Sequence, residues 1–203
     1  MAGAYALPVV EGVTIGRTVS LDPRAWQRYG DETYFALDQW ELPITAQGLI
    51  RLDDGTLVHR FYTDEEVMLQ AMSRSPDGRD AYDFTLYQPW SSNQPIDGQQ
   101  SAFFIDRMRR AWWQEIDMPA YRRFWFEGDD LDQPPLRLIE DVFEDHSGRP
   151  VRQVSQVCML YSRPLPPDGA ELLLALDIQG GTLGYGSQEI MIGVPLTPAQ
   201  FNA

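Results

Sequence analysis

Apolar and polar residues alternate along most of the chain, and this period of two is typical of half-buried β-strands. The alternating segments are separated by turn sequences. Asp54-Gly55 lies within residues 52–56 and Pro-Asp-Gly lies within residues 75–80, and both favour tight hairpin turns. Similar turn residues occupy 145–150 and 166–171. The pattern predicts about seven or eight strands in two blocks, each an antiparallel meander.

The period changes to that of a helix between the two blocks, over residues 101–116. A helix here places on one face Phe104, Ile105, Met108, Ala111, Trp112 and Ile116. Proline at 119 ends it, because the residue before a proline is disfavoured in the helical conformation. A shorter helix is predicted from Pro23 to Tyr29, with Asp22 as its N-cap. The predicted fold is α+β: a mainly antiparallel β-sheet, in two meander blocks, with one packed central helix.

Residues 109–126, RRAWWQEIDMPAYRRFWF, hold six aromatic side chains and four arginines. Core faces of the helix and of a following strand account for Trp112, Phe124 and Phe126. The opposite face then holds Trp113, Tyr121, Trp125 and Arg123. We expect this second face to be partly exposed and to contact another protein, because tryptophan, tyrosine and arginine dominate binding hot spots.

Length and charge limit the partners of this protein. A chain of 203 residues fits a single domain, residues 1–203, which buries its core without disulfides or metals. The formal net charge of -14 repels phosphate backbones and anionic lipid headgroups, so nucleic acid and the membrane surface are poor partners. A protein partner, in particular a basic one, or a cationic ligand is compatible with this charge, and so is a homo-oligomer.

The choice of reactive residues excludes several classes of enzyme. All 16 basic residues are arginines, so the chain has no P-loop lysine, kinase lysine, Schiff base or pyridoxal phosphate anchor. No cofactor is predicted. A single cysteine, Cys158, forms no intramolecular disulfide and suits a reducing compartment. The N-terminus lacks a basic signal-peptide region, and apolar runs are too short to span a membrane, so the predicted location is the cytoplasm.

Several motifs resemble a known family. They are RFYTDEEVMLQ (60–70), YRRFW (121–125), MLYSRPL (159–165) and IGVPLT (192–197). In order and rough spacing they resemble the YjfK-like proteins, a bacterial family of unknown function, over about residues 42–197. The first 41 residues are then an N-terminal extension outside the family-like core. The resemblance implies a link to bacterial membrane-stress maintenance, because related genes often lie near those of phage-shock-type proteins, and it implies no established activity.

Three motif arginines adjoin aromatic residues: Arg60, Arg123 and Arg163. A guanidinium can stack on an aromatic ring and bind a carboxylate through two parallel hydrogen bonds. The three side chains could therefore share a site for an anion or a peptide carboxylate. The alternative that we favour is a set of internal ion pairs with acids such as Glu140 and Asp64, because a buried arginine normally requires a paired acid.

The sequence predicts no metal site. Residues 127–135 hold four acids but lack the spacing of an EF-hand, so a solvated loop is expected. His59 lies in a predicted strand and His146 in a predicted turn, and neither has metal-ligand spacing to Cys158, which is expected to be an interior strand residue. The glycine-rich residues 180–187 precede a strand, so they are expected to form a hairpin or bulge and not a phosphate loop.

The sequence therefore favours a non-catalytic protein-interaction module, because it marks no nucleophile, acid pair or cofactor site. The alternative is a small enzyme or an anion-binding protein that uses arginine and carboxylate side chains. A deep pocket that joins one of the three arginines to an acid would favour this alternative, and a flat aromatic patch would favour the interaction module.

Overall fold

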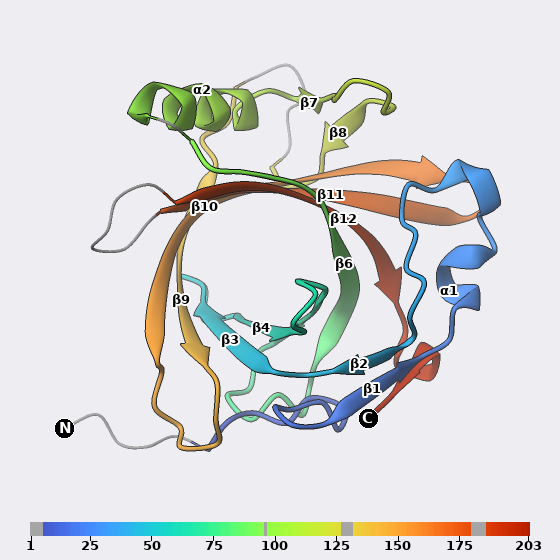
Figure 1. Ribbon diagram of the computed structural model, residues 1–203, viewed down its shortest axis with the longest axis vertical. Helices are drawn as coiled ribbons and strands as arrows, with labels where there is room; N and C mark the ends of the chain where they lie inside the picture. The colour runs from blue at the N-terminus through green and yellow to red at the C-terminus, as the bar shows by residue number, and fades with distance from the viewer. Residues whose placement is uncertain (1–5, 96, 127–131, 180–185) are drawn as a thin grey trace.

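Eight antiparallel strands close into a barrel in the computed structural model, which describes residues 6–95, 97–126, 132–179 and 186–203. Neighbouring strands follow the order β11-β12-β6-β5-β4-β3-β9-β10, and β10 pairs with β11 to close the ring (Figure 1). The strands are β3 (Ala46–Arg51), β4 (Leu57–Tyr62), β5 (Met68–Ser73), β6 (Tyr82–Asn93), β9 (Leu136–Phe143), β10 (Arg152–Leu165), β11 (Gly169–Gln179) and β12 (Ser187–Leu196).

The predicted turns are confirmed. Residues 52–56 join β3 to β4, and Gly55 adopts a φ of 86°, which the missing side chain of glycine allows. Residues 75–80 join β5 to β6, and 145–150 and 166–171 make the next two hairpins. The prediction of two separate meander blocks is wrong, because β3 pairs with β9 and β12 pairs with β6, which joins strands of the two blocks. These long-range pairings turn two meanders into one closed barrel.

Alternation along the strands divides the apolar side chains into two clusters. An inner cluster lies inside the barrel and consists of Met68, Tyr87, Cys158, Leu160, Leu172, Leu174, Leu176 and Met191. Side chains at the alternate positions, such as Leu173 and Ala175, belong to a larger outer cluster between the barrel wall and the segments that cover it. Strand β11 is therefore buried on both faces, which explains its nearly continuous apolar sequence.

The N-terminal segment packs on the outside of the barrel, where several of its residues join the outer cluster. Strand β1 (Thr18–Leu21) pairs with β2 (Glu41–Pro43) and with β13 (Phe201–Asn202), so N-terminal and C-terminal strands share a small sheet (Figure 1). The short helix α1 spans Arg24–Gln27, within the helix predicted from 23 to 29. Single 3-10 turns lie at Gly30–Glu32 and Pro198–Gln200.

The central helix α2 (Gly98–Met108) packs on β10 and β11, as predicted, but begins earlier and ends earlier than 101–116. It begins after Asp97, whose side chain accepts hydrogen bonds from the backbone N–H groups of Gln99 and Gln100. Phe104 and Met108 are buried as expected, whereas Ile116 is 88% exposed. Among the described residues, no helix has the length and apolar character needed to cross a membrane.

The end of α2 at Met108 reverses the faces predicted for residues 109–126. Strands β7 (Trp112–Trp113) and β8 (Tyr121–Arg123) form a hairpin on the outside of the barrel, with β8 paired to β10. Its inner face holds three of the four residues that were predicted to be partly exposed, Trp113, Tyr121 and Arg123, and all three are buried. The three predicted core aromatics are exposed instead: Trp112 at 56%, Phe124 at 58% and Phe126 at 45%. Both assignments were wrong. Trp112 and Trp113 lie in a strand and not in the predicted helix, and the strand predicted after them turns its other face to the barrel.

Candidate functional site

One end of the barrel holds a cavity of about 730 Å³. It lies where β4, β9 and β11 end and where β3, β5, β10 and β12 begin, so residues from seven strands or their adjoining turns line it. Apolar side chains supply part of its wall: Met68, Val142, Val154, Leu176, Ile178 and Met191. The inner cluster, which includes Leu160 and Leu172, occupies the barrel farther along these strands.

A buried ion pair lies on the cavity lining. Arg60 on β4 donates from Nη1 to Glu140 Oε2 on β9 over 2.9 Å, and their side chains are only 4% and 3% exposed. Gln156 bridges the pair: its Oε1 accepts from Arg60 Nη1 at 2.9 Å and its Nε2 donates to Glu140 Oε2 at 2.8 Å. Arg60 Nε donates to Gln70, and the Tyr62 hydroxyl donates to Glu140 Oε1. We call these five residues the polar floor.

A glycine on the neighbouring strand makes room for the polar floor. Gly48 on β3 lies opposite Arg60, and a Cβ atom at this position would lie 1.7 Å from Glu140 Oε1. The glutamate side chain therefore lies across the backbone of β3, where only glycine leaves space. The position of Glu140 inside the barrel depends on that missing side chain.

Burial and charge hold the polar floor in one protonation state. Burial lowers the pKa of the Arg60 guanidinium, but the Glu140 carboxylate, together with Tyr62 and Cys158, more than offsets this, so the pKa lies above its ordinary value. Burial and the nearby Glu140 carboxylate raise the pKa of the Tyr62 hydroxyl. The arginine is thus charged and the tyrosine is neutral near pH 7. Tyr62 can keep donating its proton to the carboxylate, which stabilises the network.

The mouth of the cavity is acidic. Asp64 and Glu66 adjoin the end of β4, Glu144 adjoins the end of β9, and Glu189 lies near the start of β12. Arg152 is the one further basic residue on the lining, and it forms an ion pair with Glu144. With the floor pair balanced, three lining acids remain uncompensated by a lining arginine, which makes the potential at the mouth negative.

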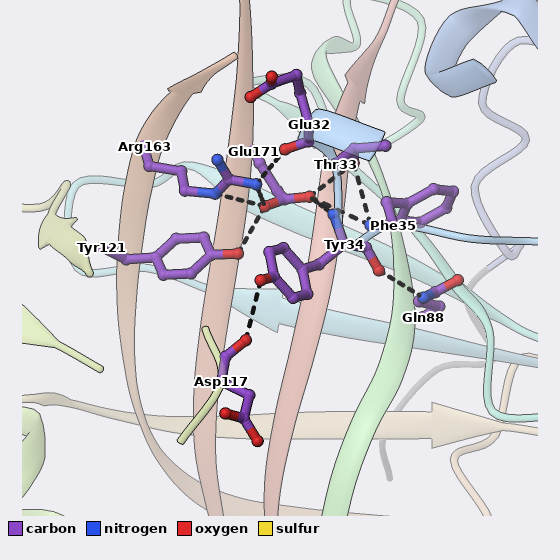
Figure 2. A network of polar contacts seen from close by, with 9 residues as sticks. All are labelled: Glu32, Thr33, Tyr34, Phe35, Gln88, Asp117, Tyr121, Arg163 and Glu171. Carbon is purple, nitrogen blue, oxygen red and sulfur yellow. Dashed lines mark hydrogen bonds and ion pairs between the residues drawn. The ribbon is translucent and has the colours of Figure 1, made fainter. Parts of the chain in front are cut away.

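A second buried network lies on the outside of the barrel wall and joins the N-terminal segment to it. Figure 2 shows the Glu171 carboxylate at its centre, between Arg163 and Tyr121 on one side and residues 33–35 on the other. Oε2 accepts from the Tyr121 hydroxyl at 2.6 Å and from Arg163 Nε at 2.7 Å. Oε1 accepts from the Thr33 hydroxyl and from the backbone N–H of Tyr34, both at 2.6 Å. Every lone-pair direction of this carboxylate is occupied, so it anchors the segment and has no capacity left for a ligand.

The three motif arginines do not meet in one site. Arg60 lies inside the barrel, Arg163 lies outside against Glu171, and Arg123 lies under the β7–β8 hairpin, where its Nη1 donates to the Arg109 carbonyl oxygen. The favoured alternative of internal ion pairs is confirmed for the Arg60–Glu140 pair. Arg163 pairs with Glu171 and not with either of the two acids that the sequence suggested.

The aromatic candidates pack on the barrel. Trp113 lies against Phe104 and Tyr161, and Tyr121 bonds to Glu171, so both are structural parts of the outer cluster. Trp125 is partly buried and packs against the two apolar clusters. None of these three side chains forms the exposed face that was expected of them.

His59 lies in β4 and His146 in the turn between β9 and β10, as predicted. Burial lowers the pKa of His59 to about 4, and its Nε2 lies 2.7 Å from the Ser73 hydroxyl. Burial raises the pKa of the Cys158 thiol to about 11, which confirms an interior cysteine that stays protonated. Across the described parts of the chain, no three histidine, cysteine, aspartate or glutamate side chains converge as metal ligands. Residues 127–131 and 180–185, on which the acidic-loop and glycine-loop predictions largely fall, lie outside the described residues.

The comparisons with known proteins give a family but no activity. A family model described as "Protein of unknown function (DUF2491)" matches residues 2–202, including the N-terminal segment that was expected to lie outside the family-like core. No curated protein and no solved structure matches the chain. The YjfK name is not part of this match, so the resemblance to that family stays a prediction.

Proposed function

The chain belongs to the DUF2491 family, whose function is unknown, and we propose that it binds a small amphipathic molecule inside its barrel. The observation that carries this proposal is the cavity of about 730 Å³ at one end of the barrel. Cavities of roughly 300–1,000 Å³ that combine apolar walls with a few placed polar groups are typical of small-molecule sites. An eight-stranded barrel is also just wide enough to hold one small ligand.

The polar floor supports a ligand site, because apolar side chains would fill the barrel with a smaller loss of hydration free energy than a buried ion pair. A buried ion pair stabilises a fold little compared with apolar side chains of similar volume, since both charges lose their hydration. Here Arg60 and Glu140 are buried but lie on the lining of a cavity. Such placement suits a site that orients a ligand by hydrogen bonds.

Binding is better supported than catalysis. Glu140 accepts hydrogen bonds from Arg60, Gln156 and Tyr62, so to act as a base it would have to give up an existing bond. Cys158, the one thiol, is protonated near pH 7, because burial raises its pKa to about 11. The alternative enzyme named above is therefore the weaker proposal, and its anion-binding form is addressed by the ligand test below.

A neutral fluorescent probe tests the binding proposal. N-phenyl-1-naphthylamine gains fluorescence in apolar surroundings, and we expect a saturable rise on titration with the protein. In the double variant Ile178→Trp/Val154→Trp two indoles at the cavity lining should weaken binding at least about tenfold, as lost cavity volume excludes the ring system.

The matched control carries the same two substitutions on exposed positions. Ile139 is 62% exposed and Val151 is 52% exposed, so Ile139→Trp/Val151→Trp should bind the probe like the wild type. Absence of saturable binding to the wild type, or equal weakening in the two double variants, would show that the cavity is not the binding site.

A self-contact is our second candidate, favoured by the exposed face of the β7–β8 hairpin. Trp112 lies directly opposite Arg122, and Phe124, which follows the end of β8, is also exposed. Because this face holds both aromatic rings and guanidinium groups, two copies related by a two-fold axis can stack the arginines of one on the rings of the other. The partner that we propose is a second copy of this chain.

Sedimentation velocity at several protein concentrations tests the self-contact. Trp112→Ser should abolish any concentration-dependent dimer, whereas Trp40→Ser, at another tryptophan that is 47% exposed, should leave it intact. A wild type that remains monomeric at high concentration would contradict this candidate. The link to membrane-stress maintenance and a basic partner remain predictions from the sequence.

A further inference from the structure

The polar floor would ordinarily indicate a site for an anion. An arginine on the wall of an apolar cavity offers a planar guanidinium that binds a carboxylate or a phosphate through two hydrogen bonds. In this barrel, however, Glu140 already occupies that place, with its Oε2 2.9 Å from Arg60 Nη1. The positive charge is balanced inside the floor, so little net attraction for a ligand anion is left.

The hydrogen bonds of the floor leave a donor to the ligand. Arg60 uses Nε for Gln70 and Nη1 for both Glu140 and Gln156. Nη2 carries the remaining two of the five guanidinium N–H groups, and a hydrogen bond between Arg60 and the Tyr62 hydroxyl uses at most one of them, while the side chain lies on the cavity lining. Both oxygens of Glu140 are occupied by Arg60, Gln156 and Tyr62. The floor therefore offers an N–H donor without an uncompensated charge.

The acidic mouth of the cavity also disfavours a ligand anion. Asp64, Glu66 and Glu189 line it, and Arg152 is paired with Glu144. A negative potential at the entrance lowers the local concentration of anions and disfavours a bound carboxylate or phosphate. Among the described residues, Arg60 forms its ion pair with Glu140 and not with these acids.

We infer that the ligand of this cavity is an amphiphile whose head is uncharged and carries an oxygen acceptor, such as an amide, a ketone or an alcohol. The acceptor oxygen takes the Arg60 Nη2–H bond, and the hydrocarbon part packs on Met68, Leu176 and Met191. This inference rests on the proposed function, because it specifies the molecule that the same cavity binds.

Three ten-carbon competitors that differ only in their heads test the inference. Decanamide, decanoate and decylammonium are titrated below their aggregation limits against the wild-type protein loaded with N-phenyl-1-naphthylamine. We expect decanamide to displace the probe at a concentration at least about tenfold lower than either charged competitor, because only its head meets a donor without an electrostatic penalty. If decanoate displaces the probe as well as decanamide or better, the inference is wrong. It is also wrong if decylammonium is the best competitor, since the acidic mouth would then select the ligand.

A charge change at the floor supplies a second test. Glu140→Gln removes the negative charge beside Arg60 with almost no change in volume, so decanoate should gain at least about tenfold in affinity. Glu144→Gln makes the same charge change at the mouth, where the side chain is 50% exposed, and should alter decanoate binding by less than about threefold. Equal gains in the two variants would mean that net charge, and not the balanced pair, excludes anions.

The two proposals fail in different ways. If the probe does not bind the wild-type protein at all, the proposed function is wrong. If the probe binds and decanoate competes as well as decanamide, only the inference about the head is wrong. A Glu140→Gln variant that does not fold leaves the wild-type competition series as the deciding measurement.

Discussion

The substitution Trp113→Ala should strongly destabilise the protein. The indole of Trp113 is 1% exposed, its ring centroid lies 5.3 Å from that of Phe104 and 5.6 Å from that of Tyr161, and the Arg107 guanidinium lies 4.1 Å from it. Its Nε1 also donates to Glu115 Oε1 at 3.1 Å. These contacts join α2 and the β7–β8 hairpin to the barrel wall, so removal of the ring opens a space that three elements share.

The size of the effect follows from these contacts. Truncation of a buried tryptophan to alanine costs about 3–5 kcal/mol in lost burial and cavity formation. Each ring pair adds about 0.5–1.5 kcal/mol, which places Trp113→Ala in the upper half of that range. For a chain of about 200 residues, 4 kcal/mol corresponds to a fall of roughly 8–16 °C in Tm.

Trp112→Ala is the matched control because Trp112 precedes Trp113 on β7 and is 56% exposed. Loss of an exposed side chain usually changes stability by less than about 0.5 kcal/mol. Urea unfolding of the wild type and both variants, followed by far-UV circular dichroism, measures how much each substitution changes the free energy of unfolding. Equal midpoints for the two variants, or a lower midpoint for Trp112→Ala, would refute the assignment of faces on this hairpin.

Turn chemistry made the hairpins predictable. Gly55 and Gly78 adopt positive φ angles of 86° and 72° in the turns where Asp-Gly and Pro-Asp-Gly predicted them. Turn geometry depends on a few adjacent residues, so a single sequence contains the needed information. Closure into a barrel was not predictable in this way, because the pairs β3–β9 and β6–β12 join residues about a hundred positions apart.

The faces of residues 109–126 were assigned wrongly for a different reason. The sequence period suggested a helix as far as Ile116, and a helix places Trp112 with Met108 on the inner side. The helix ends at Met108, and the two-residue strand that follows turns Trp113 inward instead. The error of eight residues in the end of the helix thus exchanged the faces of Trp112 and Trp113, since consecutive strand residues point in opposite directions.

The candidate site was predictable only in part. The need of a buried arginine for an acid correctly suggested an internal ion pair with Glu140, but not which of the three arginines forms it. The role of Glu171 was not predictable, because its partners Thr33 and Tyr34 lie 138 and 137 residues away. A polar residue at an inward position, such as Gln156 between Val154 and Cys158, was the available signal for the interior network, and it becomes meaningful only when the barrel defines the inside.

Three further changes follow from buried groups. Gly48→Ala places a Cβ 1.7 Å from Glu140 Oε1 and should lower stability by about 2–4 kcal/mol in urea unfolding, where a wild-type midpoint would contradict the described packing. The Cys158 thiol is buried with a pKa of about 11, so Ellman's reagent should label it at pH 8 only after unfolding, and rapid labelling of the folded protein would be evidence against its burial. His59 has a folded pKa of about 4, below the ordinary 6.5, because burial disfavours the charged ring. As the pH falls below 6.5, the unfolded chain binds a proton that the folded protein does not, so stability present in full above 6.5 is lost progressively down to about 4. Discounted for partial solvent screening, this loss amounts to about 2–3 kcal/mol. His59→Asn removes the titrating ring, so its stability should fall less than that of the wild type between these pH values, and parallel stability profiles of the two proteins would rule out a neutral buried histidine.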